Sequence, residues 1–398
     1  MIDGSLLVDR AAVPSRVRRP ERGYSLPVPA PITIPDSLTA ALTEEVERAK
    51  VPLHRQVEAL AELFDLFTRD RRDLPGRSYL DTPRHRLAYL RYHLPVNFAR
   101  AAGVLRDLAA AEPRIADLDH VVDLGAGPGS ASLAALLTLP RSEDRRFILT
   151  DRSRAALRLA SSLLTACAAR EGIEAPRPSC VAERLPSLPR IPPRSLVLLA
   201  MVLNELRGAG GRGIDTDVFL AHLDRAMIPG SVLVIIEPAL RAPGRELLRV
   251  HDALAGSGRW RVLAPCTHQR ACPLLRLRDR PWCHFHLELR SPRLVRDVAR
   301  PLGLDHQRVS LAYLAVEKLA VDAPAAEQAP AADRARVIGD PMRVRGETSG
   351  IYICREGRRE TLAEPPAGTG RGDTLRRRRG KGRRQTFELE RRWAGREG

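Results

Sequence analysis

The stretch HVVDLGAGPGSASLAALLTL, residues 120–139, decides the fold. A short apolar run ends in three glycines, Gly125, Gly127 and Gly129, and an apolar pattern of helical spacing follows directly. This order predicts a strand, a glycine-rich turn and a helix. The spacing is G-x-G-x-G, whereas dinucleotide-binding proteins carry G-x-G-x-x-G. The loop is therefore predicted to bind a ligand other than a dinucleotide, with an empty structural turn as the alternative.

Strand-like and helical patterns alternate on both sides of this loop. The strand-like runs include RFILTD (146–151), SLVLLAMVLNE (195–205) and GSVLVIIEP (230–238). Such alternation predicts an α/β fold with a parallel, doubly wound sheet that helices cover on both faces. Three later runs, RWRVLAP, CHFHLEL and QRVSLAYLAVE, are expected to complete the far edge of this sheet.

Composition and periodicity divide the chain into six segments. In the first half, apolar residues recur at helical spacing, and Pro95 is expected to break that pattern. An Ala/Pro-rich stretch later predicts a linker, and the short runs after it predict strands. The expected segments are an extended leader (1–35), a helical domain (36–118), the α/β domain with a cysteine-rich insertion (119–320), a linker (321–333), a small β module (334–370) and a basic tail (371–398).

The charge of the chain predicts an RNA partner. Its formal net charge is +17 over 398 residues, and residues 371–398 carry eleven Arg/Lys and four Asp/Glu, so 11 − 4 gives +7 there. A cationic tail of this kind is typical of proteins that bind a polyanion, although a merely solvated tail is the alternative. The tail cations expected to contact phosphates are Arg376, Arg377, Arg378, Arg379, Lys381, Arg383 and Arg384.

No run approaches the ~18–20 apolar residues of a membrane span. The N-terminal segment has no continuous apolar core and contains acidic residues, which argues against a targeting peptide. We therefore expect a cytoplasmic, monomeric protein without a membrane partner. In that compartment thiols stay reduced, and clustered cysteines bind metal more often than they form disulfides. Cys167 and Cys180 stand apart from the cluster and are expected to be buried small hydrophobes.

Acidic residues follow the predicted strands in an otherwise basic chain. Asp123, Asp151, Glu183 and Glu205 each come at or just after the end of a strand-like run. The carboxyl ends of parallel strands meet at one edge of a sheet, where the S-adenosylmethionine sulfonium cation would find nearby acids and open glycine backbone. Asp151 is placed to accept the ribose hydroxyls. The predicted cofactor-binding residues are Asp123, Gly125, Gly127, Gly129, Asp151 and Asn204.

The groups that methyl transfer commonly uses are missing around this predicted pocket. Asn204 is followed by Glu205 and Leu206, with no aromatic residue on which a flipped base could stack. No cysteine falls at a strand end facing the cleft, and none of the three lysines lies in this region. We therefore predict no catalytic residue.

The segment APCTHQRACPLLRLRDRPWCHFHLE, residues 264–288, holds Cys266, Cys272 and Cys283. Their spacing matches neither the C-x-x-C of structural zinc sites nor a common ferredoxin run, so spacing alone leaves the metal open. A histidine of the same segment, His268, His284 or His286, could complete a zinc site. The alternative fourth ligand is Cys354, about seventy residues further on.

Taken together, several motifs resemble the mitochondrial small-ribosomal-subunit methyltransferase-like family and its bacterial relatives, from about residue 40 to the end. The matching pieces are AYLRYHLPVNFA, VVDLGAGPGSASLAA, LTDRS, VLNEL, IIEP, APCTHQRACPL, WCHF, RVIGDP and YIC, followed by an Arg-rich end. The resemblance implies a class I S-adenosylmethionine-dependent methyltransferase-like fold. It also implies a [4Fe–4S] cluster on Cys266, Cys272, Cys283 and Cys354, with zinc as the alternative, and binding to a maturing small ribosomal subunit and its rRNA.

Three functions are weighed. The first is an RNA-binding assembly or translation factor that keeps an S-adenosylmethionine fold with little or no catalysis. The second is an active rRNA methyltransferase. The third is an iron–sulfur sensor without RNA, which leaves the charge of +17 unexplained. The first hypothesis accounts for most of the sequence.

Overall fold

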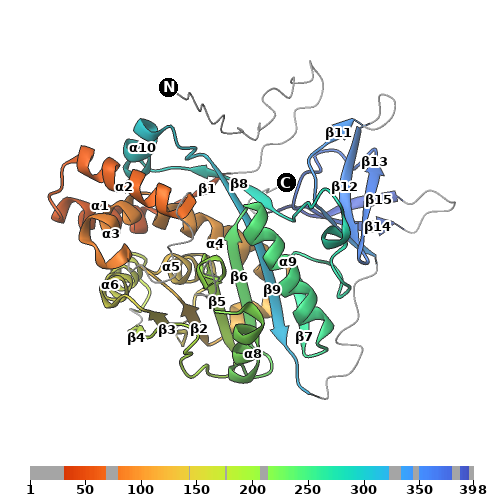
Figure 1. The fold of residues 1–398 in the computed structure, drawn as a ribbon, viewed down its shortest axis with the longest axis horizontal. Helices are drawn as coiled ribbons and strands as arrows, with labels where there is room; N and C mark the ends of the chain where they lie inside the picture. Colours follow the sequence, from red (N-terminus) through yellow and green to blue (C-terminus); the bar gives the residue numbers. More distant parts are fainter. Residues whose placement is uncertain are drawn as a thin grey trace, which may run out of the picture.

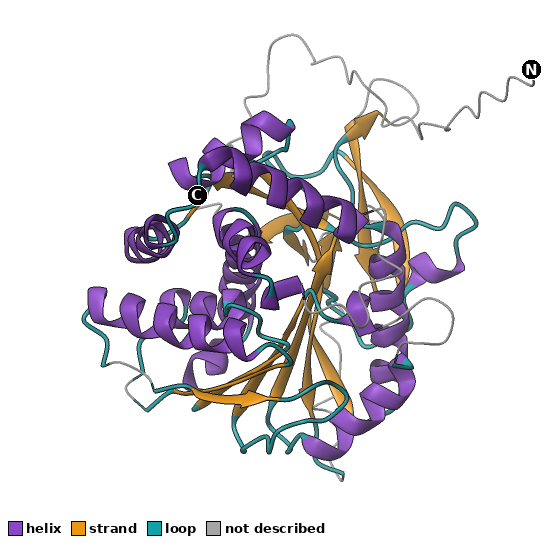
Figure 2. Cartoon of the chain, turned by 60° about the vertical axis from the view of Figure 1, so that its left-hand side comes forward, coloured by secondary structure: helices purple, strands orange, loops and turns teal. Residues whose placement is uncertain are grey.

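The structure of the chain is a computed structural model. It describes residues 31–68, 79–142, 144–174, 177–206, 214–321, 333–343, 349–378 and 386–393. A large sheet with helices on both faces forms the body of the molecule, and a second, smaller sheet stands beside it (Figures 1 and 2). Most of the predicted leader and linker lies outside the described residues.

Five parallel strands form one half of the large sheet, in the order β4-β3-β2-β5-β6. They are β2 (His120–Leu124), β3 (Arg146–Asp151), β4 (Ser179–Ala182), β5 (Ser195–Ala200) and β6 (Val232–Pro238). Strand order reverses between β2 and β5, so a crevice forms at the carboxyl ends of these strands, where such sheets bind ligands. The predicted α/β, doubly wound architecture is confirmed for this half.

The other half of the large sheet is antiparallel, a direction that the alternation of strands and helices does not specify. The long strand β9 (Arg308–Lys318) runs antiparallel to β6. On its other side it pairs with β7 (Trp260–Ala264) and β8 (Phe285–Arg290), one after the other along its length. The two-residue strand β1 (Ile32–Thr33) is added at the edge of β8. Because β9 is buried along most of its length, its apolar run gave no sign of its direction.

Neighbouring strand residues face opposite helical layers. Val121 of β2 packs with the N-terminal helices, α5 (Ser130–Thr138) and α6 (Arg154–Arg170). Its neighbour Val122 packs with α8 (Thr216–Ala226) and α9 (Arg241–Gly256) on the opposite face. This alternation, which follows from the two-residue period of a strand, separates the apolar core into two layers.

The predicted helical domain covers one face of the sheet. Its elements are α1 (Asp36–Arg48), α2 (Leu53–Thr68), η2 (Tyr79–Asp81), α3 (Pro83–Arg91), α4 (His93–Ala111) and η3 (Pro113–Asp117). The break expected at Pro95 lies instead at Tyr92, between α3 and α4. Pro95 stands in the first turn of α4, where its missing N–H removes no intrahelical hydrogen bond.

The second sheet is antiparallel and is built from the C-terminal part of the chain. Its strands are β10 (Arg334–Val337), β11 (Met342–Arg343), β12 (Ser349–Arg355), β13 (Arg358–Ala363), β14 (Thr374–Arg378) and β15 (Thr386–Arg391). Since β14 and β15 belong to this sheet, the boundary expected at residue 370 falls inside it. Arg376 and Arg378 pair with Glu390 and Glu388 across β14 and β15, so these two tail cations are already partly neutralised.

Trp393 fastens the end of the second sheet to the large one. Its ring stacks on Tyr313 with centroids 5.4 Å apart and lies 5.1 Å from the ring of Phe285. Its indole N–H donates to the carbonyl oxygen of His286 at 3.0 Å, and only 3% of the residue is exposed. The segment predicted as a free basic tail therefore carries part of the hydrophobic core.

We expect Trp393→Ala to lower the free energy of unfolding by about 3–5 kcal/mol, because truncation of a buried tryptophan leaves a cavity and an unpaired carbonyl. Urea unfolding followed by circular dichroism measures the change. Val321→Ala is the control, since Val321 is 91% exposed and should alter stability by less than about 0.5 kcal/mol. Equal stability of the two variants would contradict this assignment.

The two isolated cysteines differ from each other. Cys167 is fully buried in α6, as expected. The prediction for Cys180 is wrong: it is exposed, because β4 is the edge strand of the sheet. Within the described ranges, no helix combines the length and apolar character needed to span a membrane.

Candidate functional site

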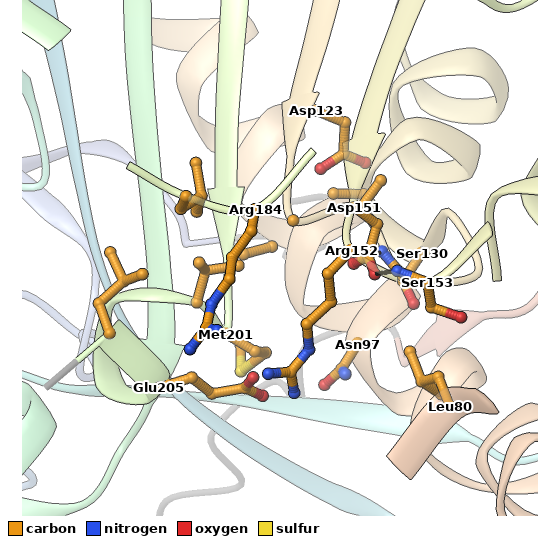
Figure 3. Close-up of a pocket in the computed structure, with 18 of the residues that line it drawn as sticks. Leu80, Asn97, Asp123, Ser130, Asp151, Arg152, Ser153, Arg184, Met201 and Glu205 are labelled. Carbon is orange, nitrogen blue, oxygen red and sulfur yellow. Dashed lines mark hydrogen bonds between the residues drawn. The ribbon is translucent and has the colours of Figure 1, made fainter. Parts of the chain in front are cut away.

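The first site is a cavity of about 130 Å³ at the carboxyl ends of β2, β3, β4 and β5 (Figure 3). Four acids that follow these strands line it: Asp123, Asp151, Glu183 and Glu205. Gly125 and Gly127 of the glycine loop line it as well. The convergence is a direct result of parallel strand direction, which brings four distant sequence positions to one edge.

The glycine loop has a backbone that favours glycine. Gly125, Gly127 and Gly129 have φ values of +74°, +52° and +86°, in the left-handed region. A Cβ on Gly125 would lie 2.7 Å from Val202, whereas one on Gly127 would meet only Leu80, at 3.4 Å. Gly129 is the N-cap residue of α5 and is not among the cavity-lining residues. It therefore shapes the turn, while Gly125 and Gly127 border the cavity.

Asp151 and Asp123 occupy different positions in the site. The Asp151 carboxylate accepts backbone N–H groups of Gly127 at 2.9 Å and of Ser153 at 2.7 Å, which fixes it against the loop. Asp123 is more deeply buried and accepts both the N–H and the hydroxyl of Ser132, at 3.1 and 2.7 Å. Burial raises the pKa of Asp123 to about 6 and also raises that of Asp151.

The N-terminal helices close this cavity, which the sequence gave no means to foresee. Tyr79 and Leu80 of η2, Tyr89 of α3 and Asn97 of α4 all line it. The Tyr79 hydroxyl donates to Glu205 at 3.1 Å, and Asn97 donates to the Tyr89 hydroxyl at 3.0 Å. Asn204, the remaining predicted cofactor residue, lies in α7 (Leu203–Leu206), and its side chain is outside the described residues.

The open side of the cavity carries charged groups. Figure 3 shows Arg152, Arg184 and Glu205 extending toward one another from three different segments. Tyr79 and Tyr89 lie nearby, and burial raises the pKa of Tyr79 well above 10 and that of Tyr89 to about 12. Both phenols are therefore protonated at neutral pH and cannot serve as general bases there.

The second site is formed by the clustered cysteines. Cys266 follows β7, Cys272 precedes the short helix η5 (Pro273–Arg276), Cys283 precedes β8, and Cys354 lies in β12 of the second sheet. All four line one buried cavity between the two sheets. Burial is the main cause that raises the pKa of Cys272 to about 11 and that of Cys283 to about 12. Without a bound cation these thiols stay protonated.

Among the described residues, no group of three or more His, Cys, Asp or Glu side chains is arranged to hold a metal ion. The four cysteines line one shared cavity of about 30 Å³. Of the three candidate histidines only His268 reaches this site, with Nε2 3.3 Å from the Cys354 sulfur. His284 and His286 bond to Trp282 and Ser310 instead.

His268 contacts Cys354 as a hydrogen-bond donor. Its Nδ1 accepts the Arg270 backbone N–H at 3.2 Å, and burial lowers its pKa to about 4. The neutral ring therefore carries its proton on Nε2 and directs it at the sulfur of Cys354.

Arg336 links the cysteine segment to both sheets and was not singled out from the sequence. Its Nε donates to the carbonyl of Pro265 at 2.8 Å, directly before Cys266, and its Nη1 donates to that of Gly372 at 2.6 Å. Nη2 lies 3.4 Å from a carboxylate oxygen of buried Asp107 in α4. Although burial opposes it, the Asp107 carboxylate keeps the pKa of Arg336 above its ordinary value. A permanent positive charge therefore borders the thiols.

The fold and the first site define the class of protein. The strand order β4-β3-β2-β5-β6-β9-β7, with β9 antiparallel, together with the glycine loop after the first parallel strand, is that of class I methyltransferases. This assignment depends on the topology of the chain itself.

A family model described as mitochondrial small ribosomal subunit Rsm22 matches residues 83–372, well over half of the chain. The chain belongs to the Rsm22 family, in agreement with the resemblance seen in its motifs. Comparison with curated proteins finds no significant match.

Solved structures with remote similarity include two methyltransferases. One is the O-methyltransferase TomG from Streptomyces achromogenes, with 15% identity over 56% of this chain and 81% of that one, and a TM-score of 0.31. The other is precorrin-6y C5,15-methyltransferase from Geobacter metallireducens, with 16% identity over 54% of this chain and 88% of that one, and a TM-score of 0.31.

Proposed function

We propose that the chain is an RNA-binding factor of the small ribosomal subunit that acts in assembly or translation. It binds S-adenosylmethionine, carries a [4Fe–4S] cluster, and transfers methyl groups weakly or not at all. The proposal rests mainly on one observation: in a chain of the Rsm22 family, three cysteines from the segment between β7 and β8 and Cys354 of the second sheet line one cavity. We further propose that it works in the cytoplasm as a monomer.

S-adenosylmethionine binding is supported by the charge and shape of the first cavity. Four carboxylates from consecutive strand ends surround it and suit a sulfonium cation. Backbone without side chains at Gly125 and Gly127 permits close approach of a ligand. When bound, the cofactor supplies an activated methyl group; the chain contributes Asp151, held by two backbone N–H groups, as an acceptor for ligand hydroxyls.

Weak catalysis is supported by the state of the groups beside this cavity. The nearby phenols are protonated, and the Tyr79 hydroxyl donates a hydrogen bond to the Glu205 carboxylate, which occupies one of its oxygens. No cysteine or histidine is among the residues that line the cavity in the described part of the chain. Methyl transfer to RNA by the pure protein is the outcome that would favour an active rRNA methyltransferase instead.

The cluster is supported by the donor set. Iron–sulfur clusters are held by four cysteine thiolates, and the candidate ligands are Cys266, Cys272, Cys283 and Cys354. Arg336 and the His268 Nε2–H would offset the negative charge of such a thiolate set.

The RNA partner is supported by the net charge of +17 and by the family of the chain. Of the tail cations predicted to contact phosphates, Arg377 is exposed in β14. Arg376 and Arg378 are paired with acids in the second sheet, whereas Arg379, Lys381, Arg383 and Arg384 lie outside the described residues. Deletion of 371–398 would also remove the buried side chains of Leu375 and Trp393, so a tail test needs substitutions rather than truncation.

A complementation assay read out by ribosome profiles on sucrose gradients tests the proposal. We expect Cys266→Ser to impair small-subunit maturation about as severely as deletion of the gene, because it removes a cluster ligand. Asp151→Ala alters only the first cavity and should impair maturation much less. If Asp151→Ala failed to restore small-subunit maturation while Cys266→Ser restored it, the function would be methyl transfer and not a structural role in assembly.

A further inference from the structure

The loop between Cys272 and Cys283 alternates leucine with arginine in the run PLLRLRDR, residues 273–280. Leu274 is 4% exposed and forms a small apolar cluster with Leu248 and Cys272, against which Leu275 and Leu277 pack. Arg276, Arg278 and Arg280 are exposed. The leucines therefore anchor the loop to the body of the protein, and the arginines are displayed to solvent.

Arg245 of α9 holds this loop in place from the inside. Its guanidinium group is buried and donates to the carbonyl oxygens of Leu274 at 3.3 Å, Leu275 at 3.2 Å and Pro281 at 3.0 Å. Three acceptors on both sides of the arginine run fix the loop backbone. The loop backbone that carries the three arginines is therefore ordered before RNA binds, so binding loses little backbone conformational entropy.

Next to this loop, Trp282 supports a further cation. The guanidinium carbon of Arg241 lies 5.4 Å from the centre of the Trp282 ring, and His284 stacks on the same indole at 5.2 Å. A Cβ on Gly244 would lie 2.5 Å from Trp282, so glycine at this position of α9 makes room for the ring. Arg241 is exposed and so extends the same cationic surface.

The arginines of this surface outnumber the acids close to them, which include Asp279 in the loop itself and Asp252 near Arg276. Residues 266–283 contain four arginines and one acid, Asp279, so 4 − 1 gives +3. In the part of the chain that the structure describes, Arg276, Arg278 and Arg280 form no ion pair. By contrast, exposed Arg376 and Arg378 of the second sheet each pair with a glutamate. Unpaired arginines on a rigid loop are suited to contact phosphates.

We propose that Arg276, Arg278 and Arg280, with Arg241 beside them, form an RNA-backbone-binding surface, here named the arginine loop. The assignment rests on the proposed RNA-binding function and locates it on the outer side of the cysteine segment. RNA is the occupant because its phosphates complement the four guanidinium groups. The family of the chain, whose model is described as mitochondrial small ribosomal subunit Rsm22, also favours RNA.

The test measures binding of the full-length protein to a fluorescent 20-nucleotide oligouridylate at several salt concentrations. The variant R276A/R278A/R280A should bind at least about tenfold more weakly at 0.1 M salt. Its slope of log affinity against log salt should fall by about 2, since each lost phosphate contact on a single strand removes about 0.7. The variant R276K/R278K/R280K, which keeps the charges, should retain most of the affinity.

The matched control is R154A/R158A/R177A, which removes the same charge from exposed positions in α6 and just before β4. Its salt slope should stay close to that of the unsubstituted protein. A wild-type slope for the arginine-loop variant overturns this inference and leaves RNA binding intact. If the unsubstituted protein binds no RNA, the proposed function fails as well. Equal competition by polyglutamate of the same charge would overturn the choice of RNA.

Discussion

Cys354→Ser is expected to bleach the anaerobically purified protein, which should be brown with equal amounts of iron and sulfide when unsubstituted. Cys354 is the proposed ligand that β12 contributes from the second sheet, whereas Cys266, Cys272 and Cys283 come from the segment between β7 and β8. Loss of one of four thiolates opens the cluster to solvent and oxygen. Absorbance near 400 nm, with iron and sulfide analysis, measures the loss.

The same substitution should lower the free energy of unfolding by about 4 kcal/mol, the scale of a cross-link that closes a loop of seventy or so residues. Cys180→Ser is the matched control: Cys180 is exposed in β4, and its substitution should change neither the colour nor the stability. A colourless, fully folded wild-type protein with stoichiometric zinc would falsify the cluster. A brown Cys354→Ser protein would remove Cys354 from the ligand set.

Gly127→Arg should reduce S-adenosylmethionine binding by at least about a hundredfold. Gly127 lines the cavity in the left-handed backbone region, and its N–H donates to Asp151. A Cβ alone would meet only Leu80 at 3.4 Å, so the effect comes from the long side chain filling the cavity together with backbone strain of about 1 kcal/mol. Isothermal titration calorimetry with S-adenosylmethionine measures the affinity.

Gly172→Arg separates these two causes. Gly172 also has a left-handed backbone, with φ +62°, but it follows α6 and a Cβ there would meet nothing within 4 Å. This control should lose about 1 kcal/mol of stability and keep full affinity for the cofactor. If both variants bind equally well, the glycine loop does not border the S-adenosylmethionine site.

Local patterns in the sequence were sufficient for the first cavity. The strand at 120–124, the glycine turn and α5 are contiguous, and the parallel direction of the neighbouring strands brings Asp151, Glu183 and Glu205 to the same edge. Each of these steps depends on periodicity within about ten residues. The contribution of Tyr79 and Asn97 depends on how the N-terminal helices pack over that edge, which no spacing in the chain records.

The features that local patterns did not predict have a common physical origin in long-range pairing. The antiparallel direction of β9 and the inclusion of β14 and β15 in the second sheet depend on contacts with strands far away in sequence. The local sequence of β14 has the pattern of a free basic tail, because its partner glutamates, Glu388 and Glu390, stand ten to fourteen residues later. Arg336 escaped notice for the same reason: its partner Asp107 is 229 positions away.

The position of Cys354 has a consequence for the synthesis of the protein. Cys266, Cys272 and Cys283 lie within 18 residues of one another, whereas the fourth cysteine of the site enters with β12, 71 positions after Cys283. A nascent or truncated chain that ends before β12 contains the strands of the large sheet, but only three of the four cysteines of the site. A chain that ends before β10 also lacks the Arg336–Asp107 contact. Completion of the proposed cluster site thus requires that translation has passed the large sheet and β12, so a copy that ends before β12 is expected to differ from a longer one in its metal content.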